Sequence, residues 1–370
     1  MLNRRSVGLA SLAVLVGMAL VACSSPGDGG SSPSQSEGGA QPQHGYTIAL
    51  SNSFLGNSWR QTMVKAFEHT AKDAKDAGII KDYVVSNTSQ NTATEQIAQI
   101  KSLILTKPSA ILINSASPTA LNPVIDEACN AGIVVVVFDS LASSRCEYDV
   151  VNGLKEYGYE SAKAVAEALG GSGDVLLIRG IVGSAAEDLI HSGMVEALDE
   201  YPNIKIVQEI TGQASDSVTQ EAVLSALPSL PTIDGVVADG SSYGALRAFE
   251  SAGRELPAAS FDNSGESLRY WRGLLDADEN YKGSSVRSEP GQASAAFWVA
   301  IELLEGRDVP QTLTVPNILV TQDTLDQWIK VTPPGNVAAW LWTQAQVQAA
   351  IEATVADKTV EAPPVPDAAP

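Results

Sequence analysis

The feature of this sequence that most restricts its fold is a set of short apolar runs that recur at intervals of about one strand plus one helix. Most of these runs are apolar at every position, as expected of parallel strands that helices cover on both faces. They form two successive series along the chain. The runs are 46–50, 83–85, 110–113 and 134–138 in the first series, and 175–178, 204–207, 235–238, 258–261, 284–286 and 318–320 in the second.

The segments between these runs carry helical patterns. Ile97, Ile100 and Ile104 repeat at helical spacing, and a similar apolar stripe occupies positions 63 to 74. Alternation of strands and helices indicates a doubly wound α/β fold. A folded part that begins near residue 46 and ends near 356 is too long for one ordinary core. We therefore predict two doubly wound parallel-sheet lobes, joined by a three-stranded hinge, with a cleft between them.

Polar side chains stand directly after several predicted strands. In open parallel sheets, ligands bind beyond the carboxyl ends of the strands, so these positions are candidates for ligand contact. They are Ser53, Asn57, Trp59 and Arg60 after the first strand, Asp139 and Ser140 after the fourth, Asp239 after run 235–238, and Asp262 and Asn263 after run 258–261.

These side chains suit a ligand rich in hydroxyl groups. A carboxylate accepts two hydroxyl protons at once, and each charged hydrogen bond contributes about 1.5–3 kcal/mol. Asn57 both donates and accepts, and the ring of Trp59 can cover the apolar face of a sugar. An aspartate after a strand is also a common helix N-cap, so each one alone has two interpretations. Together they favour a binding site in which Asp139 and Asp262 face each other across the cleft.

The sequence resembles the type I periplasmic binding proteins of the ribose-binding group over nearly all of residues 46–329. The matching segments are 47–50 with its following loop, 131–135 leading to Asp139, 179–184, 244–248 and 261–262. The resemblance implies a fold, a function and site residues. The implied ligand contacts are Ser53 and Asn57 as hydrogen-bonding groups, Trp59 as a stacking ring, Asp139 and Asp262 as the main carboxylates of the two lobes, Asp239 at or beside a second polar position, and Ser288 in place of a hinge-side glutamine.

Several positions depart from the family's pattern. Arg60 replaces a second aromatic residue, and Ala214 stands where the second lobe has another. Ile190 replaces an arginine, for which the adjacent His191 could partly substitute. Trp271 offers an alternative ring for the ligand, although ordinary helix packing is the simpler interpretation. These changes weaken the case for ribose itself.

The same resemblance implies crossovers between the lobes near residues 152–153, 288–289 and 315–316. The N-terminal lobe is then residues 46–152 plus 289–315, and the C-terminal lobe is residues 153–288 plus 316–330. Residues 331–370 extend past the family core. We expect a helix packed on the outside of the body, with Trp340 and Trp342, followed by a disordered tail rich in Pro and Ala.

The N-terminus predicts export. Arg4 and Arg5 precede an uncharged run, residues 6–22, which is the layout of a secretory signal; a transmembrane anchor is the alternative. The run ends in Leu-Val-Ala followed by Cys23, which resembles the bacterial lipobox and implies lipidation of Cys23 after removal of residues 1–22. Residues 23–45 are rich in Ser, Gly and Pro and predict a flexible tether. We therefore expect an extracytoplasmic protein anchored by lipid to the membrane, in the periplasm or on the outer face of the cytoplasmic membrane.

Cys129 and Cys146 remain as an even pair once Cys23 is lipidated. Because export places the chain in an oxidising compartment, we expect a disulfide between them, with two free thiols as the alternative.

Other classes of function fit less well. A net charge of −20 disfavours nucleic-acid binding, and no basic helix-turn-helix stands at the N-terminus. Ser242 lies in a G-x-S-x-G motif, but all three histidines precede it, so a hydrolase would lack its base. The loop 180–183 could hold a phosphate. Asp139 and Asp262 could act as a glycosidase pair, although ligand acceptors are the better interpretation.

We therefore predict a monomeric solute-binding protein, not an enzyme, without cofactor or metal. It captures a small polyhydroxylated molecule, a sugar or polyol, by hinge closure and delivers it to the permease subunits of an ABC transporter. The alternative is a binding protein that reports its ligand to a membrane receptor.

Overall fold

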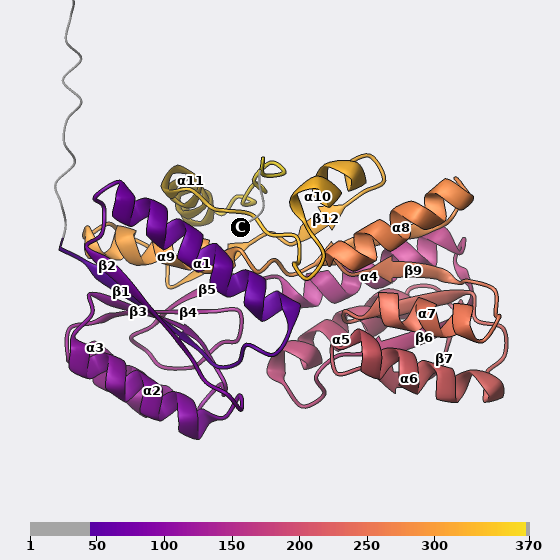
Figure 1. Cartoon of the computed structure of the whole chain (residues 1–370), viewed down its shortest axis with the longest axis horizontal. Helices are drawn as coiled ribbons and strands as arrows, with labels where there is room; N and C mark the ends of the chain where they lie inside the picture. The colour runs from indigo at the N-terminus through magenta and orange to yellow at the C-terminus, as the bar shows by residue number, and fades with distance from the viewer. Residues whose placement is uncertain (1–44, 368–370) are drawn as a thin grey trace, which may run out of the picture. The chain divides into compact units, whose positions relative to one another are not determined.

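The computed structural model describes residues 45–367, which form two sheets covered by helices on both faces (Figure 1). This confirms the predicted doubly wound α/β class, and each of the apolar runs predicted as a strand forms one. The predicted signal peptide, the lipidation site Cys23 and nearly all of the predicted tether lie outside the described residues, as do residues 368–370.

The first lobe contains a six-stranded sheet in which all neighbouring strands are parallel. Its strands, in spatial order, are β11 (Thr312–Val315), β5 (Tyr148–Asn152), β4 (Val134–Phe138), β3 (Ala110–Asn114), β1 (Thr47–Asn52) and β2 (Asp82–Asn87). Helices α1 (Ser58–Asp76) and α9 (Gln292–Leu304) cover one face, and α2 (Ala93–Thr106) and α3 (Asn122–Asn130) cover the other (Figure 1). Successive strand residues point to opposite faces, so Ile48 and Leu50 pack with α1 while Ala49 packs with α2 and α3.

The second lobe contains a second six-stranded sheet, parallel except for its antiparallel edge pair β10–β12. Its strands, in spatial order, are β12 (Ile318–Val320), β10 (Gly283–Arg287), β9 (Ala258–Phe261), β8 (Gly235–Ala238), β6 (Ser172–Arg179) and β7 (Asn203–Thr211). Helices α4 (Leu154–Ala168) and α5 (Ala185–Asp199) cover one face of this sheet. The other helices of the lobe are α6 (Asp216–Ala226), the 3₁₀ turn η1 (Leu227–Ser229), α7 (Ser242–Ser251), α8 (Gly265–Ala277) and α10 (Leu325–Val331).

Glycine allows α4 and α5 to approach each other closely. A Cβ atom at Gly158 would lie 2.0 Å from the Ile190 carbonyl oxygen, and one at Gly193 would lie 2.0 Å from the Lys155 carbonyl oxygen. Only glycine permits such contact between two backbones. The pair fixes where the N-terminal turns of α5 lie, and these turns form part of the site described below.

The chain crosses between the two sheets by three short connections: 152–154, which joins β5 to α4; 287–292, which joins β10 to α9; and 315–318, which joins β11 to β12. A fourth crossing follows α10. Residues 332–343, here called the C-terminal strap, lead from α10 beside the second lobe to α11 (Gln344–Val355) beside α9 and β11 of the first.

The C-terminal strap is hydrogen-bonded to both lobes. On the second lobe, Gly265 N donates to Asn336 O (2.9 Å) and Ala338 N donates to Asn263 O (2.8 Å). On the first lobe, Val337 N donates to Thr62 Oγ1 (3.0 Å), and Lys65 Nζ donates to the side-chain oxygen of Asn336 (2.7 Å). The strap therefore ties the lobes together across the hinge.

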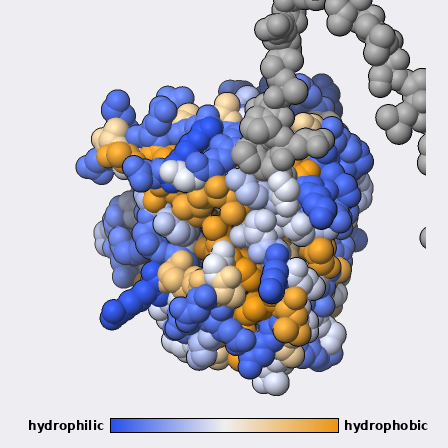
Figure 2. All heavy atoms as spheres, turned by 90° about the vertical axis from the view of Figure 1, so that its left-hand side faces the viewer, coloured by the Kyte–Doolittle hydropathy of each residue, from blue (hydrophilic) through white to orange (hydrophobic). Residues whose placement is uncertain are grey.

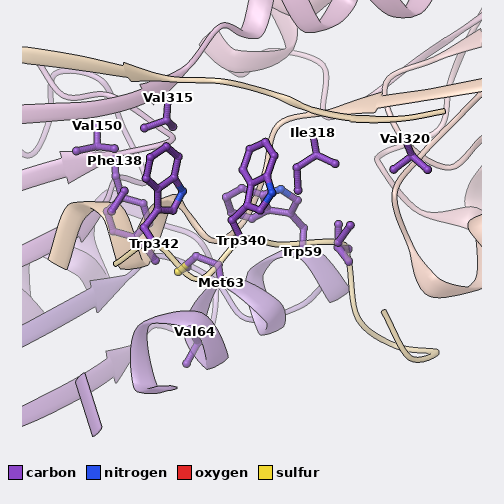
Figure 3. Packing of buried hydrophobic residues seen from close by; sticks show 14 of the residues in the cluster. Trp59, Met63, Val64, Phe138, Val150, Val315, Ile318, Val320, Trp340 and Trp342 are labelled. Carbon is purple, nitrogen blue, oxygen red and sulfur yellow. The ribbon is translucent and has the colours of Figure 1, made fainter. Parts of the chain in front are cut away.

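Two tryptophans of the strap belong to the largest hydrophobic cluster. Trp340 and Trp342 are only 4% and 2% exposed. Figure 3 shows them beside the hinge strands and α1, in a cluster that includes Trp59, Met63, Phe138, Val315 and Ile318. The helix expected within residues 331–356 is α11, but the expectation that Trp340 and Trp342 lie on it, outside the body, is wrong, because both belong to the buried, non-helical strap. Residues 358–367 have no regular secondary structure, yet Val360 and Val365 pack partly buried against the same cluster, in contrast to the disorder expected of the tail.

Cys129 at the end of α3 and Cys146 in the loop before β5 form a disulfide, with 6.4 Å between their Cα atoms. None of the helices between residues 45 and 367 combines the length and apolar character that crossing a membrane needs. On the face shown in Figure 2, hydrophobic residues lie in patches between hydrophilic ones. Apolar exposure is ordinary on protein surfaces, so by itself it does not mark a site.

Candidate ligand-binding site

A cleft of about 600 Å³ lies between the lobes, where loops from the carboxyl ends of both sheets meet. This size is typical of small-molecule sites. Both lobes contribute polar side chains to its lining. They are Asn57, Arg60, Asn91, Ser115, Ser117, Asp139 and Ser140 from the first lobe, and Ser184, Glu187, Asp188, Asp239, Arg287 and Ser288 from the second.

Asp139 is the centre of the first-lobe half of the cleft. It follows β4 and has a left-handed backbone (φ +61°), a conformation that aspartate tolerates better than most residues. Its Oδ2 accepts a hydrogen bond from Asn114 Nδ2 (2.9 Å) and lies 3.5 Å from Arg60 Nη2. Ser140 Oγ donates to the same oxygen at 3.3 Å. Gln292 Nε2 donates to Asp139 Oδ1 at 3.5 Å. The carboxylate is thus fixed from several sides before any ligand arrives.

Asn57 and Trp59 are also partly engaged within the protein. Asn57 is the N-cap of α1, because its Oδ1 accepts from Arg60 N at 2.8 Å, and this leaves its amide NH₂ to face a ligand. Trp59 donates from Nε1 to Ser288 O at 3.2 Å, and the Arg60 guanidinium carbon lies 5.4 Å from the centre of its ring. Only 7% of Trp59 is exposed, because much of the ring packs into the hinge cluster (Figure 3).

The second-lobe half of the cleft is built around Asp239 and Arg287, at the ends of β8 and β10. Burial raises the pKa of Asp239 to about 6, although the Arg287 guanidinium and the hydroxyl of Tyr157 oppose that rise. Burial also acts to lower the pKa of Arg287, but Tyr157 and the surrounding carboxylates outweigh it, so the pKa of Arg287 is raised. The guanidinium therefore stays charged among several acidic groups.

Both arginines of the cleft retain unused donors. Burial lowers the pKa of Arg60, while Asp139 acts in the opposite direction. Arg60 Nη1 and Arg287 Nε are buried and have no hydrogen-bond partner among the described residues. Leaving a buried donor unpaired costs about 1–3 kcal/mol, so a ligand oxygen that reached either group would relieve that cost.

The structure brings most of the sequence-predicted site residues together. Those that line the cleft are Asn57, Trp59, Arg60, Asp139, Ser140, Asp239 and Ser288. Ile190 and Ala214, which depart from the family's pattern, line it as well. Four predicted residues do not belong to its described lining: Ser53, His191, Asp262 and Asn263.

The structure corrects the expectation that Asp262 meets Asp139 across the cleft, because Asp262 does not line it. Its Oδ1 accepts from Ser264 N at 2.8 Å, two residues farther along its own loop. Its negative charge is among those that raise the pKa of Arg287. The strand-end aspartate of the second lobe that lines the cleft is Asp239, which also lies close enough to Asp139 for the two charges to repel.

Asn263 and Ser53 are fully buried supporting residues. Asn263 Nδ2 donates to Ile318 O at 3.2 Å, and its Oδ1 accepts from Ser285 Oγ, so both ends of the amide are used within the hinge. Ser53 Oγ donates to Asn114 Oδ1 at 3.3 Å, and Asn114 in turn holds Asp139.

His191 and Trp271 do not line the cleft. His191 Nε2 lies 3.2 Å from Glu209 on β7, so it does not take the place of the missing arginine. Trp271 is fully buried and stacks on Phe261 with 5.3 Å between ring centres. Trp271 therefore packs in the core, which agrees with the simpler interpretation of ordinary helix packing. Ser242 of the G-x-S-x-G motif is also fully buried and accepts a hydrogen bond from Asp262 N.

Arg287 and Asn114 are the main residues that the sequence reasoning missed. Both stand at the carboxyl end of a strand, Asn114 on β3 and Arg287 on β10, so the strand-end rule could have found them. Among the described side chains, no group of three or more His, Cys, Asp or Glu residues is arranged to hold a metal ion.

Known proteins show the same fold and related sequences. A sequence model described as the periplasmic binding protein domain matches residues 48–308. The ribose import binding protein of Bacillus subtilis (strain 168) is 26% identical over 281 residues, which are 75% of this chain and 88% of that protein. The xylitol-binding protein of Mycolicibacterium smegmatis is 25% identical over 253 residues, which are 66% of this chain and 70% of that protein. The crystal structure of an ABC transporter solute binding protein from Thermobispora bispora is 44% identical, with a TM-score of 0.80, and the match covers 87% of this chain and 99% of that one.

Proposed function

This chain belongs to the periplasmic binding protein family, and from that premise we propose that it captures a sugar or polyol by closure of its two lobes and delivers it to an ABC importer. The family consists of binding proteins and not of enzymes. A ribose-binding and a xylitol-binding protein are among its relatives, which supports a ligand of this class. The ligand's identity within that class is a proposal.

The observation that carries the proposal is the division of one cleft between two lobes, each of which has its own sheet. Asp139 and Arg60 come from the first lobe, and Asp239 and Arg287 from the second. A ligand that bonds to both pairs stabilises the closed arrangement, which is how a two-lobe binding protein couples binding to its change of shape.

The charges of the cleft favour a neutral ligand. Arg60 lies 3.5 Å from Asp139, and Arg287 lies among carboxylates that include Asp239, so each arginine already has a counter-charge. The loop 180–183 is poorly suited to phosphate, because Glu187 and Asp188 occupy the first turn of the following helix α5. Their negative charge opposes an anion at that helix N-terminus. Hydroxyl groups, which donate to carboxylates and accept from arginines, fit this arrangement better.

Isothermal titration against pentoses, hexoses and polyols tests the proposal directly. We expect one member of the panel to bind at a single site. Asp139→Ala and Asp239→Ala should each weaken that binding by at least tenfold, since each removes charged hydrogen bonds. Asp323→Ala, an exposed residue outside the cleft, is the matched control. If no compound in the panel binds the wild-type protein, or if neither cleft variant binds more weakly than the control, the proposal is wrong.

Export, lipid attachment at Cys23 and a monomeric state complete the proposal. The family is extracytoplasmic, which supports export. Labelling of growing cells with a fatty-acid probe should mark the wild-type protein and leave Cys23→Ser unmarked. A labelled Cys23→Ser variant would remove the anchor from the proposal without affecting the binding site.

Signalling to a membrane receptor is the alternative use of the same binding event. Uptake of the radiolabelled ligand by cells with and without the gene separates the two. Loss of uptake supports delivery to permease subunits, whereas normal uptake together with a lost transcriptional response supports signalling.

A further inference from the structure

Four exposed large apolar side chains gather in the ligand cleft. Leu141 follows Asp139 and Ser140 in the first lobe and is 41% exposed. Ile181, Val182 and Leu189 belong to the second lobe and are 42%, 47% and 46% exposed. All four line the cavity that contains the polar groups described above. Large apolar side chains that gather at one exposed place commonly mark an interaction site.

The second lobe adds a run of apolar side chains to the cleft beside its polar ones. We call Ile181, Val182, Ala186, Leu189 and Ile190 the apolar wall. Ile190 is only 5% exposed, so Ile181, Val182 and Leu189 supply most of the accessible surface of the wall. Ala214 adds a small apolar side chain to the same cleft lining.

The apolar wall is held in position by an ion pair whose carboxylate is buried and whose arginine is partly exposed. Arg179 at the end of β6 donates to both carboxylate oxygens of Glu187, at 2.7 and 2.8 Å. Glu187 lies in the first turn of α5, whose N-cap Ser184 accepts from Glu187 N at 3.2 Å. Together with the close packing of α4 on α5 at Gly158, these contacts fix the turn that carries the wall.

Closure of the lobes does not by itself provide partners for the apolar wall. The lining contributed by the first lobe is mostly polar and includes Asn91, Ser115, Ser117, Asp139 and Ser140. Leu141 is the one large aliphatic side chain that the first lobe adds to this lining. If the cleft closed around a fully hydroxylated ligand, the aliphatic groups of the wall would be buried against hydroxyls and amides. Such contacts contribute little to the free energy of binding.

We propose that the ligand carries an apolar substituent on its hydroxylated ring, as an alkyl glycoside does, and that the substituent lies against the apolar wall. This inference rests on the proposed function, because Asp139, Asp239 and the two arginines hold the hydroxylated part. The cavity of about 600 Å³ lies within the range of small-molecule sites.

A series of alkyl glycosides tests this assignment. The series uses the sugar that binds best in the panel above, with methyl, ethyl, butyl and hexyl groups, each below its micelle concentration. Burial of one methylene group strengthens binding by about fourfold. We therefore expect the dissociation constant from titration calorimetry to fall by about that factor per carbon until the wall is covered.

Variants of the wall locate the effect. Leu189→Ser and the isosteric Val182→Thr should each flatten the dependence of affinity on chain length. For each protein, the gain in affinity per added carbon is measured relative to its own affinity for the unsubstituted sugar. Any change in affinity for the sugar itself therefore cancels. Leu224→Ser is the matched control, since Leu224 is 41% exposed on α6 and lies outside the cleft.

The outcomes separate this inference from the function on which it rests. If neither free sugars nor glycosides bind, the proposed function fails. If free sugars bind but longer alkyl chains give no gain or weaken binding, the proposed function stands and the apolar substituent is wrong. An equal gain in wild type and both wall variants would show that the chain binds elsewhere, which also overturns the inference.

Discussion

The hinge contains a carboxyl group whose titration should control stability. Glu289 follows β10 at one of the crossings between the lobes and is fully buried. Its Oε1 accepts from Trp342 Nε1 at 2.9 Å, and its Oε2 accepts from Trp340 N at 3.4 Å. Burial raises the pKa of Glu289 from 4.5 to about 8, although these donors of the C-terminal strap act to lower it.

The sign and size of the effect follow from that pKa. Because the folded protein holds the proton more tightly than the unfolded chain, the contribution of Glu289 to stability is complete below pH 4.5 and is lost as the pH rises to about 8. At about 1.4 kcal/mol per pH unit, the whole loss is about 5 kcal/mol. Glu289→Gln replaces the acid with a neutral group of the same shape, so it removes this dependence.

The assay is urea unfolding of both proteins at several values between pH 5 and pH 8. Relative to wild type, the free energy of unfolding of Glu289→Gln should rise by about 3 to 4 kcal/mol across that range. Several buried carboxyl groups also have raised pKa values, among them Glu147 at about 7 and Asp149 at about 6. Only the difference between the two proteins isolates Glu289.

The reasoning is refuted if the difference in free energy of unfolding between wild type and Glu289→Gln stays constant within about 0.5 kcal/mol from pH 5 to pH 8. That result would mean that hydrogen bonds from the strap fully offset the effect of burial on the pKa of Glu289. Glu361→Gln, which alters an exposed carboxylate of the C-terminal tail, controls for the removal of one acidic group. Unequal m-values would show that the variant had changed the extent of unfolding, and the comparison would then rest on thermal unfolding.

Three further predictions concern the disulfide, the cleft and the C-terminal strap. Replacing Cys129 and Cys146 together by serine should lower the free energy of unfolding by about 3 kcal/mol, since the disulfide joins residues 17 apart; equal urea midpoints would contradict this. Ligand affinity should fall as the pH drops through about 6, because protonated Asp239 accepts hydroxyl protons poorly, and calorimetry should find this step absent in Asp239→Asn. Trp342→Ala should destabilise the protein by about 3–5 kcal/mol in chemical denaturation, against less than 0.5 kcal/mol for the exposed Val355→Ala; similar losses in the two variants would show that the strap contributes little.

Most strands could be predicted because they are buried on both faces. The run Val134–Phe138 is apolar at every position and needs no knowledge of its neighbours. β5 and β11 were not among the predicted strands, and their sequences explain why. β11 alternates exposed and buried positions at the sheet edge, and β5 beside it carries Asp149 and Asn152. Such mixed patterns become recognisable as strands only once their partner strands are known.

The sequence correctly predicted those site residues whose side chains point into the cleft simply because they stand at the end of a strand. Asp139 and Asp239 stand directly after β4 and β8 and line the cleft. Asp262 stands in an equivalent place after β9 but bonds to Ser264 N. Both conformations are open to an aspartate after a strand, and the sequence near it does not distinguish them.

The two doubly wound lobes and most of the strand-end residues around the cleft could be predicted from the sequence, because strand and helix periodicity and burial appear as local patterns. The three-dimensional contacts were needed to establish that Asp239 rather than Asp262 lines the cleft, that Arg287 joins it, and that the C-terminal strap crosses the hinge. These depend on contacts between residues far apart in the chain, such as Trp342 with Glu289. Such contacts form because they bury apolar surface and pair buried polar groups, and no short stretch of sequence records which partners will meet.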